Sequence, residues 1–241
     1  RTDYRIAARL DPATGVLSGS ETIAFQNSSD MPMRQVVLRL DQNLFAPNVP
    51  RGEAVPALTA GMKVTRLLVN GTAVDLTPAV GARGGAGRGG GGAPAPTRIF
   101  VNGLTQTVAT LTLPTPIAPG ASATIEADWN FRVPLIEGGR GLRMGSWGDS
   151  LFQVAQWYPR LAMYDGLRGW DTDPYLGPSE FYNHFGHFDV TIDVPAGWVV
   201  GATGVLQNPE QVLTPAVRER LSHVLESDST RIIVGPADFG P

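Results

Sequence analysis

Cysteine and long apolar runs are both missing from this chain of 241 residues. Without thiols the chain can form no disulfide, no thiolate metal site and no cysteine nucleophile. No stretch of 18 or more apolar residues occurs, so we expect no membrane span. The formal net charge of −3 also lacks the clustered Lys and Arg of a nucleic-acid-binding surface. We therefore expect neither nucleic acid nor a membrane span among its partners.

Long helices are not expected either, because glycine and proline are abundant. The chain contains 29 Gly and 20 Pro, and these residues favour turns over continuous helices. Hydrophobic residues make up 42% of the chain, which is enough for a sizeable core. The composition favours short strands joined by turns, in one large β domain or two small ones.

The first 40 residues alternate with the two-residue period of half-buried strands. Tyr4, Ile6, Ala8 and Leu10 share one face of the first strand. A second strand is predicted over Leu17–Asn27, with Ile23 and Phe25 facing the core. A third is predicted around the alternating residues Val36, Leu38 and Leu40.

Two hairpins are predicted next. Lys63–Asp75 contains Asn70-Gly71, a dipeptide typical of two-residue hairpin turns. Leu104–Leu113 and Ala121–Arg132 are predicted to pair across a connection too rich in proline to pair itself. Between the hairpins, residues 79–97 are rich in Gly and Pro and are predicted to be a flexible loop insertion. An RNA-binding Gly/Arg segment is disfavoured there, because it has no aromatic residue for base stacking.

The second half contains more strands and one convincing helix. His187–Val194 and Trp198–Thr203 are predicted strands around a Pro-Ala-Gly turn, and Arg231–Val234 is a predicted last strand. The helix is predicted near Pro215–Leu225, with Thr214 as its cap and proline at its first position. The predicted fold is therefore an all-β antiparallel sandwich with one short helix.

His184, His187 and Asp189 form the only metal-like cluster. Two imidazoles three residues apart can share a metal on a helix, but Gly186 and the strand pattern after it argue against a helix. In a strand, residues three apart point to opposite faces. Because zinc requires three or four converging ligands, we expect a loop entering a strand and no metal site.

Two other kinds of site are weighed and disfavoured. A serine hydrolase would need a Gly-x-Ser-x-Gly elbow, which none of the candidate serines has. Acidic residues among many aromatic side chains suggest a sugar or calcium site, but the spacing does not continue into a calcium loop, and packing in the core is the commoner use of aromatic residues. The serines are Ser146, Ser150 and Ser179, and the acidic residues are Asp165, Asp171, Asp173 and Glu180.

Several segments of the chain resemble the aminopeptidase N and leukotriene hydrolase family of zinc metallopeptidases, the gluzincins. The opening segments are Tyr4–Asp11, Leu17–Asn27 and Val37–Leu40. A more specific likeness, to a bacterial branch of the family, is carried by Gln153–Asp165 with its Trp-Tyr-Pro-Arg run, and by Gly169–Trp170, Pro174–Gly177, Glu180–Tyr182, Phe188–Pro195 and Ala202–Gly204. The resemblance implies that residues 1–241 form a single saddle-like N-terminal β domain.

The resemblance also implies that the chemistry lies outside this chain. The family's His-Glu-x-x-His helix, which binds zinc and activates water, is absent, as is its Gly-x-Met-Glu-Asn substrate strand. We therefore expect no catalytic residue, cofactor or metal in this fragment and zinc in the catalytic domain of the parent protein. The tail Gly235–Pro241 carries no stop signal of a finished domain, so the catalytic domain is expected downstream, as a partner. Export to the periplasm or medium is an expectation that rests only on bacterial relatives with leaders.

One substrate contact is implied by the same resemblance. In the family, a Glu or Gln shortly before an arginine of this domain binds the free amino terminus of the peptide. Gln156, four residues before Arg160, is the best match, and Gln153 is the alternative. An amide oxygen can accept a hydrogen bond from an ammonium group. The competing interpretation is an ordinary strand residue. A competing function for the chain is a stand-alone carbohydrate- or protein-binding β-sandwich module.

Overall fold

The chain is described here by a computed structural model, which covers residues 2–77, 97–137, 143–179 and 181–238. It divides into two compact units, Arg1–Val194 and Pro195–Pro241. Strands make up 39% of the residues and helices 11%, which confirms the all-β prediction. The expected single domain over 1–241 stays a prediction. The predicted loop at 79–97 lies outside the described residues except for Thr97.

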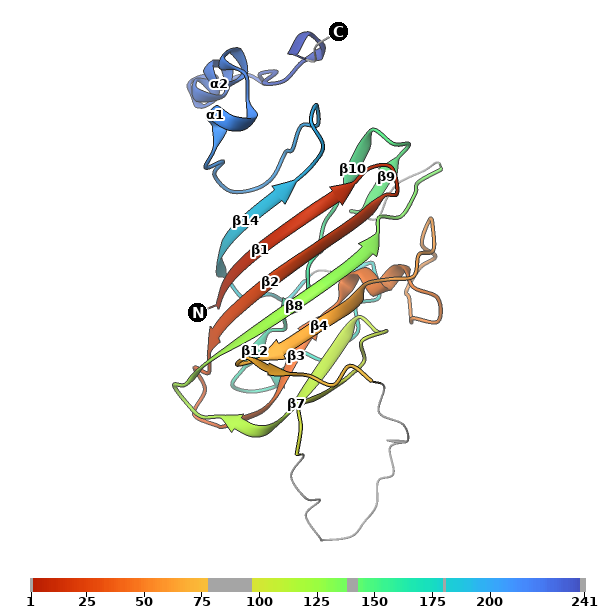
Figure 1. Cartoon of the computed structure of the whole chain (residues 1–241), viewed down its shortest axis with the longest axis vertical. Coiled ribbons are helices and arrows are strands. Elements are labelled where there is room, and N and C mark those ends of the chain that lie inside the picture. Colours follow the sequence, from red (N-terminus) through yellow and green to blue (C-terminus); the bar gives the residue numbers. More distant parts are fainter. Residues whose placement is uncertain (1, 78–96, 138–142, 180, 239–241) are drawn as a thin grey trace. The chain divides into compact units, whose positions relative to one another are not determined.

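The larger sheet of the first unit has six strands in the order β14-β1-β2-β8-β4-β5 (Figure 1). All neighbours are antiparallel except β1 and β14, which run parallel from Thr2 beside Gly186 to Arg9 beside Asp193. The strands are β1 (Thr2–Asp11), β2 (Val16–Gln26), β4 (Lys63–Val69), β5 (Thr72–Ala73), β8 (Ser122–Arg132) and β14 (Gly186–Asp193).

A second, four-stranded sheet has the order β11-β3-β7-β6. Its strands are β3 (Met33–Arg39), β6 (Phe100–Asn102), β7 (Val108–Ile117) and β11 (Arg160–Leu161). A 3₁₀ helix, η1 (Asp41–Phe45), follows β3 and is wholly buried. Two small hairpins complete the unit: β9 (Gly145–Trp147) with β10 (Leu151–Gln153), and β12 (Tyr164–Asp165) with β13 (Gly169–Trp170).

The hydrophobic core of the first unit joins the inner faces of both sheets. Every second residue of β1 is buried, as the alternating sequence predicts. Ile6, Ile23 and Ile125 of the larger sheet belong to the same buried cluster as Leu38 and Leu111 of the smaller one. Burial of such side chains contributes roughly 1.5–3 kcal/mol each, so the two sheets stabilise each other.

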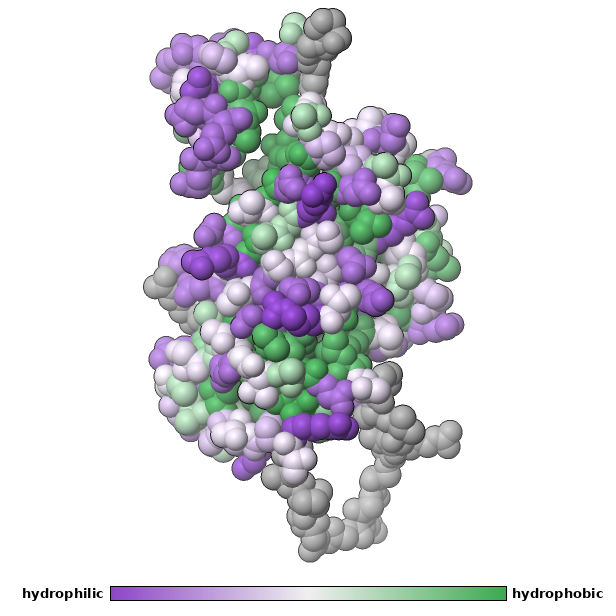
Figure 2. Space-filling view, in the orientation of Figure 1, coloured by the Kyte–Doolittle hydropathy of each residue, from purple (hydrophilic) through white to green (hydrophobic). Residues whose placement is uncertain are grey.

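The outer face of the larger sheet is polar and carries both charged and small residues. Figure 2 shows mostly pale and purple atoms over β1, β2 and β8. A shallow, open hollow lies on this face, and its lining includes Ala7, Ser18, Ser20, Asp128, Asn130 and Thr191. No aromatic side chain other than Trp129, which is buried, belongs to the lining that the structure describes.

The turn of the first predicted hairpin, at Asn70-Gly71, is confirmed. Asn70 and Gly71 both have left-handed backbones, with φ of 48° and 74°, as a two-residue hairpin turn of this type requires. The Asn70 side chain also accepts a hydrogen bond from the Thr124 amide at 2.8 Å. The turn is therefore anchored to β8, the neighbour of β4.

The second predicted pairing is wrong. β7 pairs with β3 and β6, whereas β8 pairs with β2 and β4, so the two strands belong to different sheets. The proline-rich connection is also partly strand, because β7 continues to Ile117 opposite Met33 across a register shift. Alternation identified both strands but could not identify their partners, since it specifies a face and not a neighbour.

The second unit contains the predicted helix. α2 (Pro215–Ser222) begins where predicted, and the Thr214 hydroxyl accepts a hydrogen bond from the Val217 amide at 3.3 Å. It ends three residues before Leu225, which lies in η2 (Val224–Glu226). α1 (Pro209–Val212) and η3 (Pro236–Asp238) complete the unit.

The predicted strands at Trp198–Thr203 and Arg231–Val234 are wrong. Neither segment forms a strand in the structure. A strand requires a hydrogen-bonded neighbour, and neither segment appears in any pairing of the described residues. Of the helices in the described ranges, none is long and apolar enough to cross a membrane.

Candidate substrate-binding site

Gln156 lies in a backbone conformation that few non-glycine residues adopt. Its φ is 47°, in the left-handed region, which costs a residue with a side chain about 1–2 kcal/mol. Such strain persists only where the surrounding structure holds it, and it is concentrated at functional sites. The expectation of an ordinary strand residue is therefore wrong in its geometry, because Gln156 belongs to no strand.

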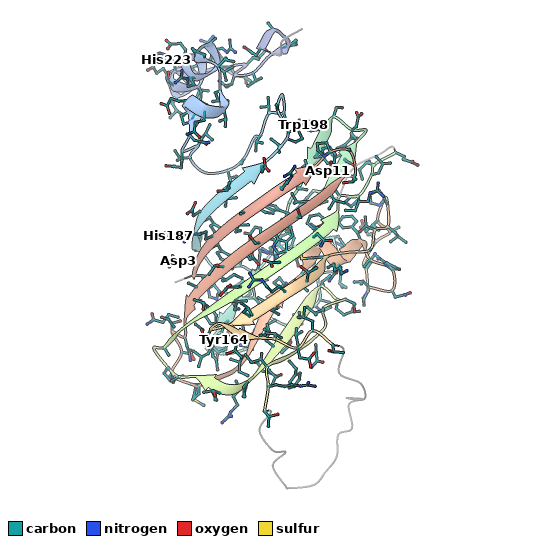
Figure 3. The ribbon with its side chains drawn as sticks, in the orientation of Figure 1. Asp3, Asp11, Tyr164, His187, Trp198 and His223 are labelled. Atoms are coloured by element: carbon teal, nitrogen blue, oxygen red, sulfur yellow. The ribbon has the colours of Figure 1, made fainter. Side chains whose placement is uncertain are left out.

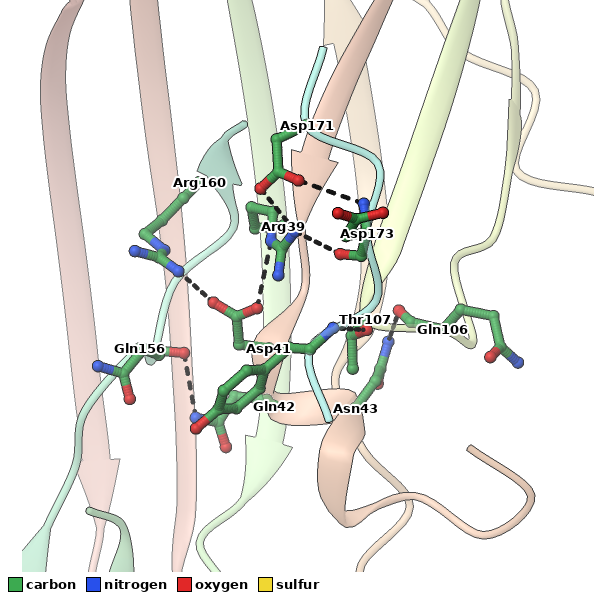
Figure 4. Close-up of polar contacts among 11 residues, drawn as sticks. Arg39, Asp41, Gln42, Asn43, Gln106, Thr107, Gln156, Arg160, Asp171 and Asp173 are labelled. Carbon is green, nitrogen blue, oxygen red and sulfur yellow. Dashed lines mark hydrogen bonds and ion pairs between the residues drawn. The ribbon is translucent and has the colours of Figure 1, made fainter. Parts of the chain in front are cut away.

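Gln42 of η1 holds this strained residue in place. The Gln42 side-chain nitrogen donates hydrogen bonds to the carbonyl oxygens of Ala155 at 3.0 Å and Gln156 at 3.1 Å. Gln42 itself is only 3% exposed. Figure 4 shows the Gln156 carbonyl pointing at Gln42, with the Gln156 side-chain amide on the opposite side. Among the described residues, that side-chain amide has no hydrogen-bond partner.

A buried ion-pair cluster holds the other end of the same segment (Figure 4). Arg39 and Arg160 are register partners on β3 and β11, and the Asp41 carboxylate contacts both guanidinium groups. Arg39 also donates to the Asp171 carboxylate at 3.1 Å and to the Asp173 carbonyl oxygen at 2.7 Å. Two arginines thus face two aspartates. This pairing satisfies the rule that buried charges require partners.

Aromatic packing fixes the residues between these two anchors. Trp157 lies against Trp129 of β8, with ring centroids 5.8 Å apart, and Tyr158 lies edge-on to Tyr4 of β1 at 5.8 Å. The buried Tyr4 hydroxyl accepts a hydrogen bond from the Leu161 amide at 3.1 Å, and burial raises its pKa. The segment from Gln156 to Arg160 is therefore fixed on the core while the Gln156 amide is left unbonded.

Gln153, the alternative substrate contact, has a different setting. It is the last residue of β10, is exposed, and lies opposite Gly145 of β9. No hydrogen bond between the amides of Gln153 and Gln156 occurs in the part of the chain that the structure describes. The two backbones are thus held differently, that of Gln153 by strand pairing with β9 and that of Gln156 by the Gln42 side chain.

The histidines of the metal-like cluster point to different partners. The His184 Nε2 accepts a hydrogen bond from the Tyr164 amide at 3.1 Å, and partial burial lowers the pKa of His184. His187 lies beside Asp3 across the β1–β14 pair, with Nδ1 3.2 Å from the carboxylate (Figure 3). Asp189 pairs with Arg5 at 3.6 Å. Within the described ranges, no three His, Asp or Glu side chains gather as metal ligands would.

Among the candidate serines and acidic residues, Ser146, Asp165 and Asp171 form hydrogen bonds with backbone groups. The Ser146 hydroxyl donates to the Pro134 carbonyl oxygen, while Ser150 and Ser179 are exposed. The Asp165 carboxylate accepts from the amides of Leu167 and Arg168, which lowers its pKa. Asp171 accepts from the Asp173 amide at 3.2 Å and from Arg39. Glu180 lies outside the described residues.

Glu21 is a buried acid that the sequence reasoning missed. It is 3% exposed on the inner face of β2, between Ile6 of β1 and Ala127 of β8. Neither carboxylate oxygen has a hydrogen-bond partner among the described residues, and burial raises the pKa of Glu21 well above its usual value. The signal was available, because Ile23 faces inward and a residue two positions away in a strand shares that face.

No family model and no curated protein matches the chain. Among solved structures, it is similar to a mutant of an M1 zinc metallopeptidase from Deinococcus radiodurans bound to a Tyr-Ser-Ala substrate. The identity is 18%, the TM-score is 0.44, and the match covers 86% of this chain and 35% of that one. A mutant of a two-domain M1 zinc metallopeptidase bound to L-tryptophan matches at 19% identity and a TM-score of 0.43, over 85% of this chain and 35% of the other. The chain thus spans about a third of the length of these solved chains.

Proposed function

We propose that this chain is the N-terminal, non-catalytic domain of a zinc-dependent aminopeptidase. It would pack on a downstream catalytic domain and help bind the amino terminus of the peptide substrate. The support from sequence is the Trp-Tyr-Pro-Arg run at 157–160 and the segments around it. The described residues hold no ligand group that fits zinc, so the proposal assigns the metal and its chemistry to the catalytic domain.

The observation that carries the substrate role is the setting of Gln156. Its backbone is strained and anchored by the buried Gln42, while its own amide is unbonded in the described structure. An amide oxygen accepts hydrogen bonds, and a peptide's terminal ammonium group is a donor that needs acceptors. The anchored backbone at Gln156 also has little main-chain freedom to lose on binding, which favours affinity.

The test is a pair of alanine variants in the full-length protein. Gln156→Ala should lower kcat/KM for substrates with a free amino terminus by about 12- to 150-fold, since a hydrogen bond to a charged group contributes roughly 1.5–3 kcal/mol. Gln153→Ala is the matched control, because it removes the same side chain three residues away and should leave kinetics unchanged. The measurement is steady-state kinetics on a peptide and on its N-acetylated form, which lacks the ammonium group.

The outcomes separate the parts of the proposal. A loss in Gln153→Ala alone would move the amine contact to Gln153, and unchanged kinetics in both variants would remove it from this domain. Aminopeptidase activity of purified residues 1–241 would contradict the assignment of catalysis to another domain.

A further inference from the structure

We infer that Gln42 is a positioning residue for Gln156: it locks the left-handed backbone at Gln156 and thereby sets the direction in which the Gln156 side chain leaves the backbone. The consequence for substrate rests on the proposed function, whereas the conformational part stands on the structure of this chain. Gln42 touches no substrate in this scheme and acts only through the segment it holds.

The donor geometry of Gln42 is the first support. A primary amide has two N–H donors, and the Gln42 nitrogen bonds two consecutive carbonyl oxygens, those of Ala155 and Gln156. Both donors are therefore used on one short stretch of backbone. Losing these bonds would leave the half-buried carbonyl oxygens of Ala155 and Gln156 without their protein donor, which removes the free energy that the bonds contribute.

The position of Gln42 in η1 is the second support. Asp41, its neighbour, holds Arg160 through an ion pair, and Gln42 holds Gln156. Two consecutive residues of one 3₁₀ helix therefore fix both ends of the segment Gln156–Arg160. Removing the Gln42 contact would leave the Arg160 end in place and free only the Gln156 end, so the expected change is local.

The third support is the strain at Gln156. A left-handed non-glycine residue returns to a common conformation unless neighbouring contacts oppose it. Among the described contacts, the two hydrogen bonds from Gln42 are the ones that reach the carbonyl oxygens on either side of the strained φ angle. Rotation of the backbone at this residue would turn the Cα–Cβ bond with it, and the side chain would leave the backbone in another direction.

The experiment compares Gln42→Met with Asn43→Leu in the full-length protein. Met has nearly the shape of Gln but no donors. Asn43 is the matched control because it is an equally buried amide of η1 that donates to two carbonyl oxygens elsewhere, those of Leu104 and Gln106. If Gln42→Met does not fold, Gln42→Asn replaces it, since its amide is one methylene too short to reach both carbonyls.

Two readouts are needed, a crystal structure of each variant and the split between KM and kcat. We expect Gln156 to leave the left-handed region in the Gln42 variant and to keep it in Asn43→Leu. We expect KM for free-amine substrates to rise by the same factor as in Gln156→Ala, with kcat little changed. Combining Gln42→Met with Gln156→Ala should add no further loss, because both changes remove one interaction.

The positioning role of Gln42 and the proposed function are contradicted by different results. If Gln156→Ala raises KM but the Gln42 variant keeps both the left-handed backbone and the wild-type KM, the positioning role is overturned and the proposed function stands. If Gln156→Ala leaves KM unchanged, the proposed amine contact at Gln156 fails. The crystal structures then decide the positioning role alone: a relaxed Gln156 supports it and a retained left-handed Gln156 refutes it.

Discussion

The buried carboxyl group of Glu21 should make the stability of this chain depend on pH. Glu21 faces the core without a hydrogen-bond partner in the described structure, and burial raises its pKa. The charge of Glu21 also raises the pKa of the Tyr4 and Tyr158 hydroxyls, and neither hydroxyl offers it a positive charge. The folded state therefore favours the protonated acid, whereas the unfolded chain releases the proton near pH 4.3.

The sign of the effect on stability follows from this difference. Below the unfolded pKa both states are protonated, so folding carries no penalty from ionising Glu21. As the pH rises toward the folded pKa, only the unfolded state loses its proton, and stability falls by up to about 1.4 kcal/mol per pH unit. Glu21→Gln cannot titrate and should lack this component. The free energy of unfolding of both proteins, measured by urea between pH 4 and 8, should show the variant gaining on the wild type as pH rises. A constant difference would contradict a raised pKa.

At the scale of elements, the turn of the β4–β5 hairpin allows the cost of a left-handed backbone to be measured without any steric clash. A Cβ added at Gly71 would meet no atom within 4 Å, yet φ there is 74°. The cost of Gly71→Ala should therefore be purely conformational, about 1 kcal/mol. Gly166→Ala is the control, because that glycine also has open space around it but no left-handed φ; it should be neutral or slightly stabilising. Thermal or urea unfolding measures both, and equal effects would refute the conformational account.

Strands and turns were predicted well where the signal lies in residues that are neighbours in the sequence. Alternation located β1 and β2, and Asn70-Gly71 located its turn. Long-range pairing was not predicted: β7 and β8 were assigned to each other, and the parallel partner of β1 was not anticipated.

The candidate site likewise combines a residue that the sequence indicated with residues that only the fold reveals. Resemblance singled out Gln156, but Asp41 and Gln42 lie in a short polar run between strands, and nothing local in such a run indicates burial. Only the tertiary fold brings them to residues more than 110 positions away.

At the scale of the whole molecule, the two units differ in how much they bury. The core of Arg1–Val194 draws on both sheets. Among described residues of Pro195–Pro241, Val217 is the one buried apolar side chain, while Leu225 is 96% exposed and Val205 is 83% exposed. Local stability follows buried apolar contacts.

We expect amide hydrogens of α2 to exchange at least about 100-fold faster than those of β2 and β8, a difference of roughly 2.7 kcal/mol in the free energy of opening. Hydrogen exchange read by mass spectrometry tests this, and equal protection would contradict it.

The parallel pairing of β1 with β14 has a consequence for the order of events during synthesis. β1 leaves the ribosome well before its second neighbour, which is complete only at Asp193. At about 5–20 residues per second, one edge of β1 stays uncovered for roughly ten seconds or more. Unpaired strand edges of nascent chains invite association with other chains. β1 thus depends on a strand that is translated much later, and a chaperone that shields strand edges would act within that interval.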